Sequence, residues 1–193
     1  EKHGKHSHGI DAYIHYQSPV ISRTLENILI SVKYSKDKYP NAPVEKFKDH
    51  YKDLGMAIES FKKSELRSKT INSRSDFETV FDRGIIFWLN NIDDNSEDLV
   101  QKLFKLEAPK DFNHDGIFLV DNNKIEFFFN AIEFAKRKYS NKPVMFTYFN
   151  TGLNSDNLSP ENGAIMPVQY LASNILPMRV QIDRMAYPIL HWK

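Results

Sequence analysis

The sequence predicts an α+β fold: an N-terminal antiparallel helical hairpin and two further helices, then a small mixed sheet with one covering helix. Three observations predict it. Apolar residues recur every three or four positions through the first half of the chain, short apolar runs follow Pro109, and prolines separate many of these segments. Because 193 residues can bury one core, we expect a single compact domain over residues 18–193, whose only internal boundary would lie near 109.

The helical hairpin is expected over residues 18–61. Ser18-Pro19 is typical of a helix start, and Pro40 would end this first helix. The second helix begins at Pro43 and carries an apolar seam at spacings of three and four residues: Val44, Phe47, Tyr51, Leu54, Ile58 and Phe61. Since few residues join the two helices, each should cover the apolar stripe of the other. His50, beside Tyr51, is expected to face solvent.

Two further helices are expected after this hairpin. The first starts at the capping box of residues 75–78 and runs through Trp88, although Gly84–Leu89 alone also fits a strand. The second follows the acidic segment 93–98, which supplies capping oxygens, and ends before Pro109. The helical half of the chain would therefore end near residue 109.

The β part is expected after Pro109. Apolar runs at 117–120 and 144–149 flank a helical pattern over 125–139, which is the length of a parallel strand-helix-strand crossover. The alternative is a helix followed by a hairpin. A polar loop over 150–163 and three extended segments, 165–171, 178–183 and 186–192, complete the chain.

Composition excludes several classes of function. The chain has no cysteine, which removes disulfides, thiolate metal sites and thiol nucleophiles. A net charge of +1, with 19 Lys but only 7 Arg, argues against nucleic acid as a partner, and no apolar run is long enough to cross a membrane. The start at Glu1 instead of methionine favours a processed protein, secreted or periplasmic, although a cytoplasmic protein also fits.

Any metal site must therefore be built from imidazole and oxygen ligands, and two segments offer them. Residues 1–17 form a His-rich polar segment in which His3, His6 and His8 could bind Zn²⁺ or Cu²⁺. The second segment, 111–116, resembles the first half of a calcium loop, with Asp111, Asn113 and Asp115 as oxygen ligands before Gly116. Asn122 stands where such a loop needs its bidentate Glu, and an ion-free Asx turn explains the spacing equally well.

Catalysis is the second hypothesis. If residues 117–120 and 144–149 form neighbouring parallel strands, Asp121 and Asn150 follow their carboxyl ends and could share a pocket. No standard catalytic motif accompanies them. The main prediction is therefore a non-enzymatic binding or interaction protein whose partner is another protein or a small ligand, with divalent metal as a candidate ligand. The alternative is a small hydrolase-like enzyme with its site at these two strand ends.

Overall fold

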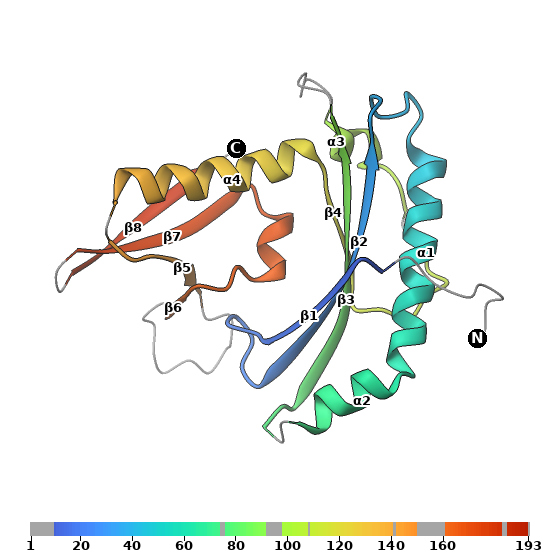
Figure 1. The fold of residues 1–193 in the computed structure, drawn as a ribbon, viewed down its shortest axis with the longest axis horizontal. Helices are drawn as coiled ribbons and strands as arrows, with labels where there is room; N and C mark the ends of the chain where they lie inside the picture. Colours follow the sequence, from blue (N-terminus) through green and yellow to red (C-terminus); the bar gives the residue numbers. More distant parts are fainter. Residues whose placement is uncertain are drawn as a thin grey trace. The chain divides into compact units, whose positions relative to one another are not determined.

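A computed structural model of the chain describes residues 10–73, 76–91, 98–107, 109–140, 142–149, 161–182 and 185–192. Over these residues the fold is α+β, with eight strands in two sheets, four α-helices and one 3-10 helix (Figure 1). The chain divides into two units, Glu1–Gln17 with Arg23–Asn123, and Ser18–Ser22 with Lys124–Lys193. The single domain expected over residues 18–193 stays a prediction. Because strands come first, the predicted N-terminal helical hairpin is wrong.

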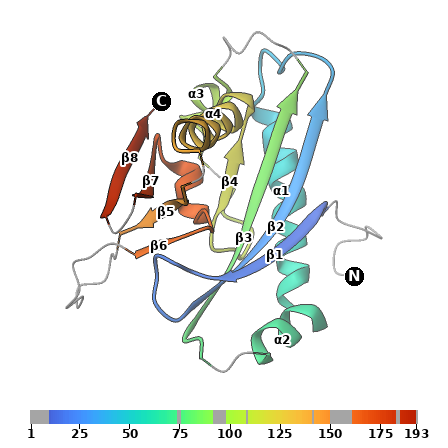
Figure 2. The same cartoon turned by 60° about the vertical axis from the view of Figure 1, so that its left-hand side comes forward.

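The first unit is built on a mixed four-stranded sheet in the order β1-β2-β3-β4. β1 (Ala12–Gln17) runs antiparallel to β2 (Thr24–Ser35), while β3 (Thr79–Asn90) and β4 (Ile117–Val120) run parallel to β2. The chain crosses from β2 to β3 through α1 (Val44–Lys62) and α2 (Glu65–Asn72), and α1 lies along one face of this sheet (Figure 2). The short helix α3 (Leu99–Leu103) follows β3.

β2 and β3 replace two predicted helices, and part of each strand is buried on both faces. Thr24–Leu29 is buried without interruption, so the alternation of apolar and polar residues that usually marks a strand is missing. Apolar residues on both faces also match helical spacing by chance. In β3, a Cβ on Gly84 would lie 2.7 Å from Leu54 Cδ2, so this glycine allows α1 to approach the sheet closely.

α1 confirms the predicted helix after Pro43, and its apolar seam packs on the sheet, not on a second helix. Leu54, Ile58 and Phe61 form one core cluster with Leu29 and Trp88. Tyr39, in the connection before α1, contacts the Trp88 ring edge-on, and its hydroxyl donates to the Trp88 carbonyl (2.7 Å). This core fixes the second half of α1 against β2 and β3.

The second unit holds an antiparallel sheet in the order β6-β5-β7-β8, together with most of α4 (Asn122–Lys138) and the 3-10 helix η1 (Val168–Ala172). Its strands are β5 (Val144–Tyr148), β6 (Glu161–Gly163), β7 (Ile175–Ile182) and β8 (Met185–Trp192). The predicted elements at 117–120, 125–139 and 144–149 are confirmed as β4, α4 and β5. The predicted parallel crossover is wrong, because β4 and β5 belong to different sheets.

Within the described residues, no helix is both long and apolar enough to cross a membrane.

Candidate active site

Asp11 stands immediately before β1 and is fixed against the second half of β2. Its backbone N–H donates to the carbonyl of Ile30 (2.8 Å), and its side-chain Oδ2 accepts the N–H of Val32 (2.6 Å). The β1–β2 ladder begins with Ala12 opposite Ile30, and Asp11, just outside it, bonds to Ile30 and Val32, the two neighbours of Ser31. Asp11 remains exposed, and its carboxylate is therefore held in place but open to solvent.

Ser31 and Lys33 lie on the face of β2 that α1 covers. Alternate residues of a strand share a face, and Leu29 of the same series belongs to the core packed on α1. Residues two apart on one strand are about 7 Å apart. The Ser31 hydroxyl and the Lys33 ammonium therefore share this face of β2, and the Asp11 carboxylate is held on the backbone of Val32, between these two residues. We call Asp11, Ser31 and Lys33 the Asp11 site.

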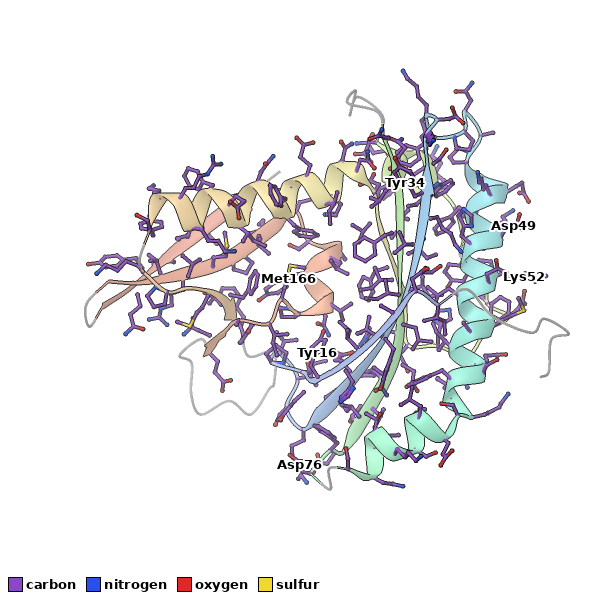
Figure 3. The ribbon with its side chains drawn as sticks, viewed as in Figure 1. Tyr16, Tyr34, Asp49, Lys52, Asp76 and Met166 are labelled. Carbon is purple, nitrogen blue, oxygen red and sulfur yellow. The ribbon has the colours of Figure 1, made fainter. Side chains whose placement is uncertain are left out.

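A pocket of about 270 Å³ adjoins the Asp11 site at Lys33. We call it the Lys33 pocket; it is lined by the end of β2, the first turns of α1 and one residue of β3: Val32, Lys33, Tyr34, Ser35, Lys46, His50 and Trp88. Figure 3 shows Tyr34 near the end of β2, whereas Asp49 and Lys52 project from α1 away from the sheet. The charged side chains that line this pocket are both lysines.

His50 is held against the buried Trp88 instead of facing solvent as predicted. The two rings meet edge-on, with centroids 5.0 Å apart and an interplanar angle of 89°. Burial lowers the pKa of His50 below its ordinary 6.5, Lys33 and Lys46 lower it further, and Asp53 and Asp49 offset part of this effect. His50 is therefore neutral at pH 7, and within the described residues its buried Nε2 has no hydrogen-bond partner.

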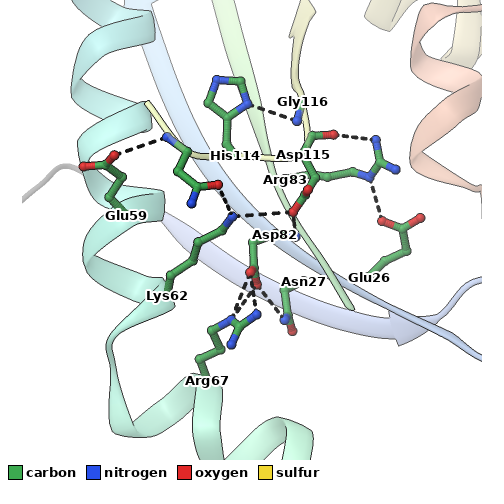
Figure 4. A network of polar contacts seen from close by, with 11 residues as sticks. Glu26, Asn27, Glu59, Lys62, Arg67, Asp82, Arg83, His114, Asp115 and Gly116 are labelled. Carbon is green, nitrogen blue, oxygen red and sulfur yellow. Dashed lines mark hydrogen bonds and ion pairs between the residues drawn. The ribbon is translucent and has the colours of Figure 1, made fainter. Parts of the chain in front are cut away.

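Two other carboxylates of the sheet, Glu26 and Asp82, are 0% and 1% exposed. Arg83 Nε donates to Glu26 Oε2 (2.8 Å), and Arg67 donates to Asp82 Oδ2 from Nε (2.9 Å) and from Nη2 (2.8 Å), as Figure 4 shows. The Asn27 amide also donates to Asp82 (2.9 Å). Because an arginine neutralises each charge away from solvent, we infer that these acids stabilise the fold and do not meet substrate.

Two of the side chains predicted to bind calcium instead make hydrogen bonds and an ion pair within the protein. Lys62 Nζ donates to Asn113 Oδ1 (2.9 Å) and lies 3.7 Å from Asp115 Oδ2, which also accepts the backbone N–H of Asp82 (2.8 Å). Gly116 has a φ of 124°, as the expected sharp turn requires. Two of the three proposed ligands thus contact a lysine, and Asp111 is exposed.

In the part of the chain that the structure describes, no group of three or more His, Asp or Glu side chains could hold a metal ion. The prediction of a metal-binding protein therefore has no support in this part of the chain. His3, His6 and His8 lie outside the described residues. The assignment of individual metal ligands in the two segments stays a prediction.

The two strands that the predicted catalytic pair was expected to follow, β4 and β5, belong to different sheets. Asp121 follows β4 and is 1% exposed, directly before α4 begins. Asn150 lies outside the described residues, so its role stays a prediction.

The sequence does not predict the Asp11 site, because its residues fall in the wrong predicted elements. Ser31 and Lys33 are expected in a helix, where they would not share a face, and Asp11 in a polar segment. The signal for strands lies in the β-branched residues Ile28, Ile30 and Val32 and in the β-favouring Tyr13-Ile14 shortly after Asp11.

One comparison with known proteins gives a match. A family model described as the GAPS4 protein PD-(D/E)XK nuclease domain matches residues 1–124, which is well over half of the chain and includes β1 to β4, α1 and the Asp11 site. No curated protein and no solved structure matches. The match overturns the prediction of a non-enzymatic binding protein, and the alternative of a small hydrolase-like enzyme agrees with it better.

Proposed function

Because the chain belongs to the PD-(D/E)XK nuclease domain family of GAPS4 proteins, we propose that it hydrolyses phosphodiester bonds in nucleic acid and that the Asp11 site carries the reaction. The observation that supports this most directly is the hydrogen bond that fixes the Asp11 carboxylate to the N–H of Val32, the residue before Lys33 in β2, within the matched residues. Nucleic acid then becomes the substrate, although the net charge of +1 argued against it. That total hides the local charge, since two lysines line the Lys33 pocket.

The motif in the family's name is present in this chain only in altered form. The chain contains no Pro-Asp pair, and no Asp or Glu stands two residues before any lysine. Ser31-Val32-Lys33 supplies the lysine with serine in the acidic position, and Asp11 supplies a carboxylate immediately before the neighbouring strand β1. Among the buried acids, Glu26 and Asp82 are paired with arginines and do not fill that position. The Asp11 site is therefore the arrangement that best matches the motif.

The donor set fits Mg²⁺ and not a metal that needs a cage of protein ligands. Mg²⁺ keeps several waters and is often bound through one or two carboxylates together with substrate phosphates. Asp11 supplies one exposed carboxylate, whereas Ser31, between the two residues to which Asp11 bonds, is uncharged and 2% exposed. Asp11 would hold the ion jointly with the nucleic acid, and the ion would supply Lewis-acid activation of the phosphate and of the attacking water.

In the proposed reaction, the protein's own residues provide a fixed carboxylate and a positive charge. The hydrogen bond from the Val32 N–H fixes the carboxylate of Asp11, so little reorganisation is needed when the substrate binds. Lys33, on the same face of β2, places an ammonium where it can neutralise the negative charge that develops on the phosphate oxygens. Water adds to phosphorus, one P–O ester bond breaks, and the leaving oxygen takes up a proton.

The test is cleavage of supercoiled DNA, single-stranded DNA and single-stranded RNA by the full chain, with Mg²⁺ or with EDTA. We expect Mg²⁺-dependent cleavage of at least one substrate, and a loss of about 100-fold or more in Asp11→Asn and in Lys33→Gln. Asn at position 11 can still accept the Val32 N–H, so the fold should survive. Asp37→Asn and Lys36→Gln are the matched controls, because both residues are exposed just after β2.

Circular dichroism melts of all four variants establish that each is folded. The proposal fails if no substrate is cleaved in Mg²⁺, or if the folded Asp11 and Lys33 variants cleave as well as the two controls.

A further inference from the structure

The Lys33 pocket carries more positive charge than the proposed reaction requires. Lys33 belongs to the Asp11 site, but Lys46 and His50 project from α1 and reach the pocket from the opposite side. Among the described residues that line it, none is acidic. At about 270 Å³ it lies below the usual ~300–1,000 Å³ of small-molecule sites, so it admits a small group and not a whole cofactor.

The start of α1 adds to this positive potential. The helix begins after Pro43, and no side chain caps it, so its first-turn N–H groups and the positive end of its dipole are not neutralised by a capping oxygen. The acid in its first turn, Glu45, pairs with Lys48 (2.8 Å). Lys46, in the same turn, lines the pocket. The start of α1 and the two lysines of the pocket together favour the binding of an anion there.

His50 adds a second and independent observation at this pocket. Its Nε2 is buried and lacks a hydrogen-bond partner in the described part of the chain, although buried polar atoms are normally paired. The ring is neutral at pH 7, as shown above, so one of its nitrogens carries an N–H that can donate to a phosphate oxygen. A ligand with several acceptor oxygens would satisfy both the ring and the two lysines.

We propose that the Lys33 pocket binds a phosphate group of the nucleic acid beside the one that reacts, with Lys46 and His50 as its ligands. This inference rests on the proposed nuclease function and deepens it. The same chemistry suits an internal phosphodiester, which would make the pocket a strand-tracking subsite, or a terminal phosphate, which would make it an end-recognition subsite. Lys46 and His50 are binding residues and need not contact the reacting atoms.

The test measures binding in the cleavage-silenced Asp11→Asn chain, by fluorescence anisotropy with three single-stranded oligonucleotides of one sequence: with a 5′-phosphate, with a 5′-hydroxyl, and closed into a circle. Lys46→Gln should weaken binding about tenfold and reduce the slope of log K against log [salt] by about 0.7. Lys48→Gln is the matched control, since it removes the same charge two residues away on α1. It should leave both quantities unchanged.

The three oligonucleotides separate the sources of the phosphate. An effect of Lys46→Gln on all three indicates an internal phosphodiester, and an effect on the 5′-phosphate strand alone indicates a terminal one. Equal losses in Lys46→Gln and Lys48→Gln would show a general effect of charge and overturn the proposal.

Imidazole NMR provides the second measurement. The ring resonances of His50, assigned with His50→Gln, should shift when the oligonucleotide is added, while those of His114 should not. Unshifted His50 resonances at saturating oligonucleotide would also overturn the proposal. Because these measurements need no cleavage, a wild type that binds through Lys46 without cleaving would refute the nuclease function and leave the pocket intact.

Discussion

The carboxylate of Asp82 tests the distinction between acids that stabilise the fold and acids that serve the reaction. Asp82 is 1% exposed and accepts hydrogen bonds from Arg67 and Asn27. Asp82→Asn removes the charge and leaves the Arg67 guanidinium without its partner. Loss of one member of a buried pair costs about 3–5 kcal/mol, and we expect about 3 because Arg67 is 24% exposed and can be partly hydrated.

Urea unfolding measures this loss. With m near 2 kcal/mol/M, a change of about 3 kcal/mol lowers the midpoint by about 1.5 M. Trp88 is buried in the first unit, so its fluorescence in a Trp192→Phe background reports the unit that holds Asp82. Glu78→Gln is the control, because the Glu78–Arg23 pair is exposed (62% and 56%) and should contribute at most about 1 kcal/mol.

Equal and small midpoint shifts in Asp82→Asn and Glu78→Gln would refute the structural role of Asp82. A full loss of cleavage by Asp82→Asn with unchanged stability would instead move the reaction from Asp11 to Asp82.

Three further predictions follow from the same unit. Gly84→Ala should destabilise by about 1–3 kcal/mol in urea, because the added Cβ would lie 2.7 Å from Leu54 Cδ2, and unchanged stability would contradict this packing. Tyr39→Phe should cost about 1–2 kcal/mol, since its hydroxyl contacts both the Trp88 carbonyl and Asn122; a neutral effect in the same assay would argue against these bonds. Burial is the main cause that lowers the pKa of both His50 and His114 below 6.5, so stability is full above pH 6.5 and is lost as the pH falls below it. The Tm should therefore fall between pH 6.5 and 5, less steeply in His114→Gln, and a flat Tm over this range would contradict it.

The parts of the fold that the sequence predicts correctly are those with one buried face or with a short isolated run. The seam of α1 shows helical spacing because only one side of that helix packs on the sheet. β4 and β5 are bounded by turn residues, which mark the ends of both strands, although the predicted pairing of the two strands was wrong.

β2 and β3 could not be predicted in the same way. Thr24–Leu29 of β2 and Gly84–Ile86 of β3 are buried on both faces, so the apolar residues there carry no period of two. Parallel pairing of Leu29 with Gly84 joins residues 55 positions apart, and nothing local to either strand encodes it.

The candidate site depends on such distant pairings. Asp11 and Ser31 become neighbours only through the β1–β2 ladder, and His50 reaches Lys33 only because α1 crosses back over the sheet. The loop 111–116 shows the converse. Its spacing is locally right for calcium, but Lys62, about 50 residues away in the chain, contacts two of the proposed ligands.

The central claim is that Ser31 occupies the acidic position of the nuclease motif, between Asp11 and Lys33. It is tested most directly by the Mg²⁺ concentration that gives half-maximal cleavage in Ser31→Asp and in Ser31→Asn, two variants of nearly equal shape. Added ligand charge strengthens binding of a hard cation, so Ser31→Asp should lower this concentration by about tenfold or more, and Ser31→Asn should not. If both folded variants need as much Mg²⁺ as the wild type, the claim is contradicted.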